Sequence, residues 1–125
     1  MSGIYVASKS RHGQMWRDLR GDGLPICSTW IDESDGGATA DWGDLWSRCV
    51  AEASSADALL ALHVDGEEWK GAFVEIGAAL AAGRPVFVVG KPPGSWVHHP
   101  LVTLVPDLGQ AFLAIESVVR KVADP

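Results

Sequence analysis

The sequence predicts a single α/β domain of three layers, in which a parallel sheet of four to five strands carries helices on both faces. Short β-rich runs alternate with helical patterns along all 125 residues, an order typical of parallel sheets. The runs 58–64 and 85–89 are almost entirely apolar, as strands buried on both faces are. A chain of this length suits one domain, which we expect to span residues 1–125.

The elements in the first half of the chain are predicted from the spacing of apolar residues. β-rich runs predict strands, apolar residues three or four apart predict helices, and glycines end them. The predicted order is strand 4–8, helix 12–20, strand 25–31, polar loop 32–40 and helix 41–53. The last helix is strongly amphipathic, and we expect one face to carry Trp42, Leu45, Trp46, Cys49, Val50 and Ala53.

The second half continues the alternation. Gly83 follows an apolar helical run at the position that usually ends a helix. The run 101–105 is a weaker strand pattern than the two before it. The predicted order is strand 58–64, acidic loop 65–69, helix 70–82, strand 85–89, loop 91–100, strand 101–105 and helix 107–122.

Charge and composition exclude several classes of protein. The chain carries 16 acidic and 10 basic residues, for a net charge of −6. An acidic domain without a basic stripe is poorly suited to duplex nucleic acid or to an anionic membrane surface. No stretch resembles a transmembrane helix or a signal peptide. We therefore expect neither duplex nucleic acid nor a membrane as a partner.

The cysteines and histidines predict no metal site. Cys27 and Cys49 stand in apolar contexts without metal-ligand spacing, which is typical of free thiols in a reducing cytosol. The neighbours His98 and His99 would point to opposite sides of a strand, and no third ligand is spaced to join them. We expect a cytoplasmic protein without a bound metal.

The ends of the predicted strands indicate where a ligand would bind. In open parallel sheets, ligands bind beyond the carboxyl ends of the strands. Lys9 and Arg11 could meet a phosphate there beside backbone N–H groups, or they could be solvated surface bases. The polar residues that follow the first three predicted strands include Ser8, Lys9, Arg11, Asp32 and Asp65.

The predicted helix 70–82 carries an unusual carboxylate. Glu75 is the only ionisable residue between Gly71 and Gly83. Its neighbours on the same helical face are all small, namely Gly71, Ala72, Ala78 and Ala79. A ligand or another segment of the chain can therefore approach this face closely. Either Glu75 is a solvated residue on an alanine-rich face, or it is a partly buried carboxylate that serves as a nucleophile in glycosyl transfer.

Four segments together resemble the nucleoside 2-deoxyribosyltransferase family, including the related (deoxy)nucleoside monophosphate N-glycosidases. They are IYVAS at 4–8, SSADALLAL at 54–62, KGAFVEIGAAL at 70–80 and GRPVFVVG at 83–90, and the third matches the signature G-x-x-x-E-x-G-x-A. STWIDE at 28–33 and VHHP at 97–100 resemble features of a bacterial and phage branch. The resemblance spans nearly the whole chain and implies a flavodoxin-like fold.

The resemblance also implies a retaining mechanism that needs no cofactor. Glu75 would attack the anomeric carbon of a nucleoside or nucleoside monophosphate and expel the base, and the sugar ester would pass to water or to a second base. Tyr5 matches the tyrosine that orients this nucleophile, although it could be an aromatic residue at the edge of the core. The leaving base needs a proton. Asp65 is the first candidate donor and Asp32 the second, and both could be solvated loop acids.

Further residues are assigned to substrate binding. Trp30 and Trp69 lie in or beside predicted loops, where a core does not need them. Gly71 allows a close approach to the helix. In the family, the segment after the fourth strand reaches into a neighbouring subunit's site. The resemblance therefore implies a homodimer or higher homo-oligomer in which the partner's site is completed by Ser95, His98 and His99.

One position departs from the family pattern. Relatives often carry an aspartate six residues before the nucleophile, and Trp69 stands there instead. This substitution argues against transferase activity in particular. It leaves a non-catalytic nucleotide-sensing module on the same fold as the alternative. A third possibility is an NAD-cleaving domain like the Toll/interleukin-receptor type, which also uses a glutamate at the edge of its sheet.

Overall fold

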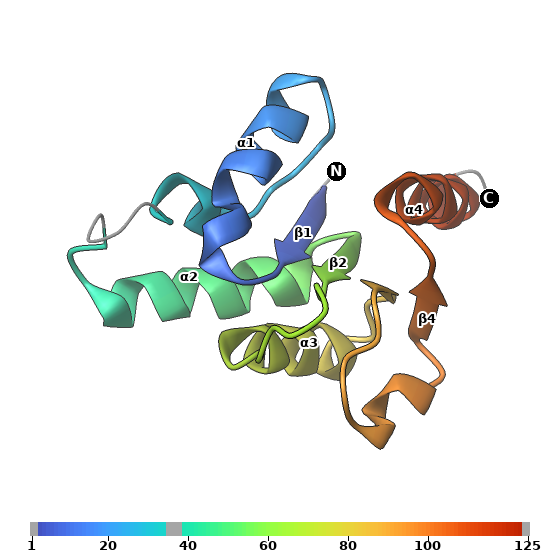
Figure 1. The fold of residues 1–125 in the computed structure, drawn as a ribbon. Helices are drawn as coiled ribbons and strands as arrows, with labels where there is room; N and C mark the ends of the chain where they lie inside the picture. The colour runs from blue at the N-terminus through green and yellow to red at the C-terminus, as the bar shows by residue number, and fades with distance from the viewer. Residues whose placement is uncertain (1–2, 35–38, 124–125) are drawn as a thin grey trace.

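A computed structural model describes residues 3–34 and 39–123, and it shows a parallel sheet between two layers of helices (Figure 1). All three strand pairings are parallel, and the strands follow one another across the sheet in chain order. The three-layer α/β fold is therefore confirmed. The strands are β1 (Ile4–Ala7), β2 (Ala58–Leu62), β3 (Val86–Val89) and β4 (Val102–Val105).

The helices cover both faces of the sheet. Figure 1 shows α1 (Gly13–Gly21) and α4 (Leu108–Ala123) above the sheet, with α2 (Trp42–Ser55) and α3 (Gly71–Ala81) below it. On the lower face α3 contacts the sheet directly, and α2 packs mainly against α3. The helices begin and end within two residues of the positions that the sequence predicts. The carboxyl ends of β1 and β2 therefore open toward the start of α3.

The burial of each strand explains how strongly apolar its sequence is. Every residue of β1, β2 and β3 is buried, so their sequences are almost continuously apolar. The edge strand β4 is only partly covered, and Leu104 is 54% exposed. This difference accounts for the weaker pattern at 101–105.

The strand predicted over 25–31 is wrong. This segment makes one bridge, from Ile26 to Ile4, and then enters the 3-10 helix η2 (Thr29–Asp32). Two side chains take the place of the missing strand along the outer edge of β1. The N–H of Val6 donates to Ser28 Oγ at 2.7 Å, and the Val6 carbonyl accepts from Trp30 Nε1 at 2.7 Å. Because these backbone groups are satisfied, the edge needs no fifth strand.

The apolar face predicted for α2 is also partly wrong. Trp42 is 65% exposed and Val50 is 39% exposed. Because α2 packs mainly on α3 rather than on the sheet, a narrow stripe of side chains is enough to cover the contact. That buried stripe consists of Leu45, Cys49 and Ala53. The predicted loop 32–40 lies partly outside the described residues, since these omit 35–38.

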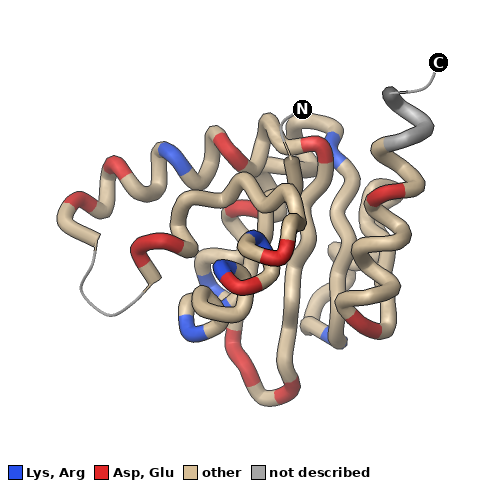
Figure 2. Tube along the Cα trace, turned by 90° about the horizontal axis from the view of Figure 1, so that it is seen from above, with Lys and Arg blue, Asp and Glu red and all other residues tan. Residues whose placement is uncertain are grey.

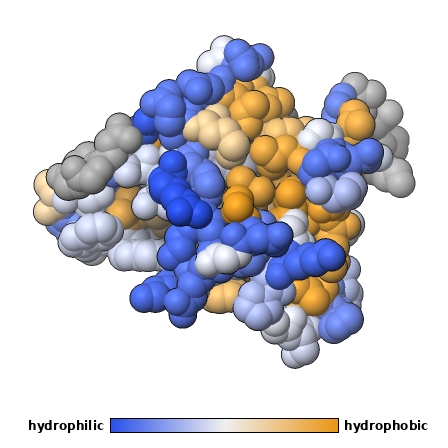
Figure 3. Space-filling model, viewed as in Figure 1, coloured by the Kyte–Doolittle hydropathy of each residue, from blue (hydrophilic) through white to orange (hydrophobic). Residues whose placement is uncertain are grey.

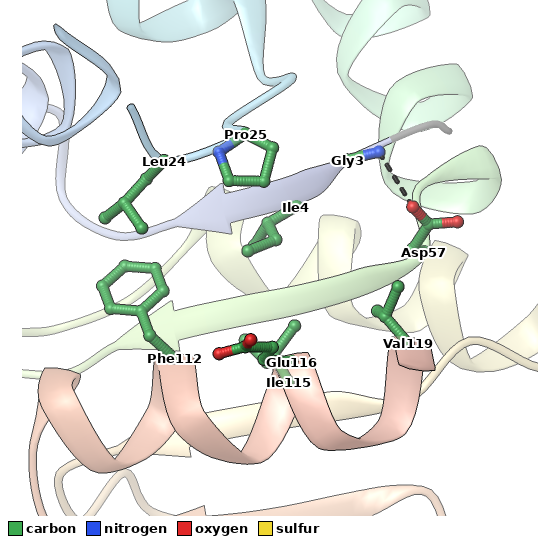
Figure 4. Close-up of a pocket in the computed structure, with 9 residues that line it drawn as sticks. All are labelled: Gly3, Ile4, Leu24, Pro25, Asp57, Phe112, Ile115, Glu116 and Val119. Carbon is green, nitrogen blue, oxygen red and sulfur yellow. Dashed lines mark hydrogen bonds between the residues drawn. The ribbon is translucent and has the colours of Figure 1, made fainter. Parts of the chain in front are cut away.

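An apolar groove of about 290 Å³ lies between α4 and the start of β1 (Figure 4). Ile4 and Leu24 face Phe112 and Val119 across it, and Asp57 at its end accepts a hydrogen bond from the N–H of Gly3 at 3.1 Å. Figure 3 shows apolar residues gathered between α1 and α4 on this face. The groove lies at the amino end of β1, away from the carboxyl edge of the sheet.

The distribution of charge agrees with the composition. Acidic and basic positions are interspersed along the trace in Figure 2, and none of the described segments forms an extended basic stripe. Within residues 3–34 and 39–123, no helix is both long enough and apolar enough to cross a bilayer.

Candidate active site

Glu75 lies in the second turn of α3, beside the carboxyl edge of the sheet, and only 8% of the residue is exposed. Burial follows from the packing of α2 against α3 and from the small residues around the carboxylate on α3. Its Oε2 atom has no hydrogen-bond partner among the described residues. A buried carboxylate oxygen without a partner is energetically unfavourable, so it needs a functional or ligand-bound explanation.

The side chain of Glu75 borders a cavity of about 220 Å³. Residues that are far apart in the sequence form its walls, which come from the segment after β1, from η2, from α2 and from the start of α3. The lining residues are Ser8, Lys9, Ser10, Trp30, Trp42, Leu45, Trp46, Cys49, Trp69, Lys70, Gly71, Ala72 and Glu75. The cavity therefore joins a carboxylate to tryptophan walls and a basic rim.

Tyr5 is an electrostatic neighbour of Glu75 but does not itself line the cavity. The residue is fully buried in β1, and its hydroxyl has no hydrogen-bond partner within the described part of the chain. Burial, reinforced by Glu75 and Cys49, raises the pKa of the phenol far above its ordinary value. The phenol is therefore neutral at every physiological pH and can act only as a hydrogen-bond donor or acceptor.

The environment of Glu75 shifts its pKa to about 7, well above the ordinary 4.5. Burial is the largest cause, and the negative charge of Glu52 acts in the same direction. The Tyr5 phenol lowers the pKa but does not outweigh burial. Near neutral pH the carboxylate can thus exist in both protonation states, and carboxylates with such shifted pKa values are concentrated at functional sites.

Cys49 lies in the wall of the same cavity and is 3% exposed. Burial raises the pKa of its thiol to about 11. A thiol with this pKa remains protonated and is a poor nucleophile at neutral pH. Cys27 is likewise a free thiol with a pKa of about 11, again mainly because of burial.

Trp69 forms an apolar wall of the cavity at the position where the chain departs from the pattern of the family that it resembles. Its Nε1 donates to the carbonyl of Leu62 at 3.2 Å. Its ring makes edge contacts with His63 and Phe73, at centroid distances of 5.1 Å and 5.6 Å, and a tilted contact with Trp96 at 6.3 Å. The side chain is therefore held rigidly. Among the described lining residues, Glu75 is the only carboxylate.

The segment after β1 contributes Ser8 and Lys9. The Ser8 hydroxyl accepts from Trp16 Nε1 at 2.8 Å and donates to the carbonyl of Lys9 at 3.0 Å. Lys9 is half-buried and Lys70, on the facing segment, is exposed. These two lysines place positive charge at the rim of the cavity.

Arg11 does not line the cavity with Lys9. Its Nε donates to Glu67 Oε2 at 2.8 Å, and His12 Nε2 lies 2.7 Å from the same oxygen. The Glu67 side chain is 1% exposed, and burial acts to raise its pKa. The Val64 N–H, His12 and Arg11 act in the opposite direction and hold the pKa of Glu67 below its ordinary value. Arg11 thus joins the loops after β1 and β2.

The structure does not bring the two candidate proton donors to Glu75. Asp32 is exposed and receives two hydrogen bonds from Arg20, at 2.7 Å and 3.0 Å, which lower its pKa. Asp65 is exposed in the loop after β2. Neither residue lines the cavity.

The segment after β3 also lies apart from the cavity of the same chain. Ser95 and His98 belong to the exposed 3-10 helix η3 (Ser95–His98), and His99 follows it. The Nδ1 atom of His99 accepts from the N–H of Leu101 at 3.0 Å. None of these three residues lines the cavity of the same chain.

Sequence reasoning missed several residues at the site. Trp42, Trp46 and Cys49 line the cavity, and their spacing of three or four residues placed them on one face without showing what that face contacts. Glu67 was also missed, because its partners Arg11 and His12 lie more than fifty residues away in the sequence. No local pattern marks such a contact.

No protein-family model matches the chain, and no curated protein matches its sequence. Among solved structures, the CMP N-glycosidase BcmB of Clostridium botulinum has a similar fold, with a TM-score of 0.59. The match covers 91% of this chain and 98% of that chain. Because the two sequences are only 12% identical, the likeness shows that the two proteins share a fold and shows no more than that.

Proposed function

We propose that the protein cleaves or exchanges the N-glycosidic bond of a (deoxy)nucleoside or nucleoside monophosphate through a covalent glycosyl ester on Glu75. The observation that carries this proposal is the buried carboxylate itself, whose Oε2 is unpartnered among the described residues and which borders a cavity at the carboxyl edge of the sheet. The similar fold of a CMP N-glycosidase supports the same class of reaction.

The geometry suits a retaining displacement. The ionised carboxylate attacks C1′ of the sugar, and the C1′–N bond breaks with its electron pair going to the base. Tyr5 is a neutral electrostatic neighbour of the carboxylate, and we assign to its phenol the role of donating a hydrogen bond to Glu75 during the attack. Water or a second base then attacks C1′ and releases Glu75. Every covalent step uses the carboxylate, so the reaction needs no cofactor.

The basic rim favours a phosphorylated substrate. Lys9 and Lys70 both line the cavity, and an ammonium group is a compact positive charge that binds phosphate. A nucleoside monophosphate would place its sugar toward Glu75 and its phosphate toward the lysines.

The test is to incubate the protein with a panel of nucleosides and nucleoside monophosphates and to measure the free base by chromatography. We expect Glu75→Gln to lower turnover by at least about 10³-fold, because the nucleophile is lost. The matched control is Glu68→Gln, which changes an exposed acid in the preceding loop and should leave turnover unchanged. A 2-fluoro sugar analogue should add its glycosyl mass to the peptide that contains Glu75.

A second candidate function is nucleotide binding without turnover. The rigid Trp69 wall favours it, because the described lining residues offer no second carboxylate to protonate a leaving base. Tight binding of a nucleotide by calorimetry, with no base released over many hours, would favour this function over catalysis.

We further propose that the chain acts as a homo-oligomer. Trp42, Phe73 and Val74 are 65%, 38% and 52% exposed on the adjoining helices α2 and α3, a pattern typical of interaction surfaces. Light scattering should then report a mass above 13.3 kDa. If His98 acts in a partner's site, mixing inactive Glu75→Gln and His98→Ala chains should restore part of the turnover. A strictly monomeric, fully active protein would contradict this.

A further inference from the structure

Tryptophan side chains are concentrated around the candidate active site. Four tryptophans contribute to its walls, namely Trp30, Trp42, Trp46 and Trp69. The faces of tryptophan rings attract cations more strongly than those of any other side chain. Six tryptophans occur in the whole chain, so their concentration around one small cavity indicates a ligand with an aromatic or charged group.

The carboxylate in this cavity makes no ion pair within the described part of the chain. Glu75 is buried, its Oε2 has no partner, and no ion pair to Glu75 occurs among residues 3–34 and 39–119. A buried carboxylate is costly unless a cation pairs with it. Burial holds its pKa near 7, and a ligand cation would lower that pKa and favour the nucleophilic form. A positively charged ligand therefore matches the site better than a neutral one.

The described lining residues include no second acid, and this also favours a positively charged ligand. An uncharged base is a poor leaving group unless an acid protonates it. A base that already carries a positive charge at the glycosidic nitrogen leaves as a neutral molecule. Such a substrate would need no proton donor, which fits the positions of Asp32 and Asp65 outside the cavity.

Resting on the proposed function, we propose that the substrate is an N-glycoside of a positively charged heteroaromatic ring, such as a pyridinium nucleotide, held by the tryptophans. Glu75 forms a bond to C1′, and the C1′–N electron pair neutralises the ring nitrogen, so the base departs uncharged. Water then hydrolyses the ester and adds a hydroxyl to C1′. The sum is glycoside cation plus water giving sugar, neutral base and one proton.

The two lysines of the cavity indicate that the substrate also carries an anionic group. Lys9 and Lys70 would repel a ligand that carried only positive charge. A nucleotide with a cationic ring and an anionic phosphate satisfies both parts, since its phosphate meets the lysines while its ring lies among the tryptophans. The inferred ligand is thus zwitterionic.

The turnover experiment compares nicotinamide mononucleotide, whose ring is a pyridinium cation, with CMP, whose base is neutral. We expect base release from the pyridinium nucleotide to be at least 100-fold faster. Equal or faster release from CMP would overturn the inference and leave the proposed function intact.

A binding experiment separates this inference from the proposed function, because it requires no turnover. The probes are the N-methylnicotinamide cation and neutral nicotinamide, followed by tryptophan fluorescence. We expect the cation to bind at least tenfold more tightly and to release protons at pH 7, an effect that Glu75→Gln removes. Trp42→Leu should weaken cation binding about tenfold and Trp42→Phe much less, while Trp96→Phe, outside the cavity, is the control.

The outcomes are distinct. Selective cation binding without release of base from any nucleotide would support the cation site while the proposed function fails. Equal binding of the two probes, or binding that is unaffected by Trp42→Leu, would overturn the inference.

Discussion

The indole ring of Trp46 lies directly over Gly71, so closely that a β-carbon on Gly71 would stand 2.7 Å from ring atom Cη2. The same β-carbon would stand 3.9 Å from Glu75 Oε1. Because Gly71 has no side chain, a residue of α2 and the carboxylate of α3 can border one cavity. A glycine is therefore required at position 71 by close packing rather than by a special backbone angle.

Gly71→Ala should destabilise the fold and distort the cavity. The new methyl group would push the rigid Trp46 ring outward, at a cost of roughly 1–3 kcal/mol, which exceeds the gain of up to about 1 kcal/mol in helix propensity. The matched control is Gly77→Ala in the same helix, where nothing lies within 4 Å of the new carbon. That variant should be stabilised by about 0.5–1 kcal/mol. Urea unfolding of the two variants should give opposite signs.

Replacing Glu75 should change how stability depends on pH. The folded-state pKa of about 7 lies above the ordinary 4.5, so between these values the folded protein holds a proton that the unfolded chain has lost. The unfolding free energy of the wild type therefore falls as pH rises from about 4.5 to 7 and is level above 7. Glu75→Gln, which does not titrate, should gain on the order of 3 kcal/mol relative to wild type over that range.

This prediction is checked by urea unfolding at pH 5 and pH 8. Glu68→Gln alters an exposed carboxylate, and its stability difference from wild type should be the same at both pH values. If Glu75→Gln behaved like Glu68→Gln, the carboxylate would have no raised pKa in the fold.

Trp30→Phe should lower the free energy of unfolding, because the indole N–H of Trp30 bonds the outer edge of β1 in place of a neighbouring strand. The Val6 carbonyl would lose the Nε1 donor 2.7 Å away, and an unsatisfied buried carbonyl costs about 1–3 kcal/mol. Trp96→Phe provides the comparison, since Trp96 Nε1 donates to the carbonyl of Pro93 in an exposed position. Its loss should cost below about 1 kcal/mol. Similar thermal unfolding of the two variants would contradict the role assigned to Trp30.

Asp32→Asn and Asp65→Asn should leave base release within about twofold of wild type, since neither carboxylate lines the cavity. Asp32→Asn breaks an exposed ion pair with Arg20, and such pairs contribute less than about 1 kcal/mol to stability. Steady-state assays across pH 5–9 check this. A large drop in turnover for either variant would restore it as the proton donor.

The order of strands and helices was predictable from the chain because it depends on local periodicity. Strands such as β2 and β3 are buried on both sides, so their sequences must be continuously apolar. The strand predicted over 25–31 failed for a tertiary reason. Its apolar pattern is real, but the side chains of Ser28 and Trp30 bond the edge of β1 in place of the backbone.

The amino-acid sequence by itself determined the α/β architecture and singled out Glu75, because an isolated acid in an apolar helix is visible in a short window of residues. Only the tertiary structure decided that this carboxylate is buried, that tryptophans from separate segments surround it, and that Arg11 bonds Glu67. Local patterns report whether a side chain prefers a core or a surface. Which distant side chains come into contact depends on how the helices pack across the sheet. That packing cannot be predicted from the residues that neighbour each side chain in the sequence.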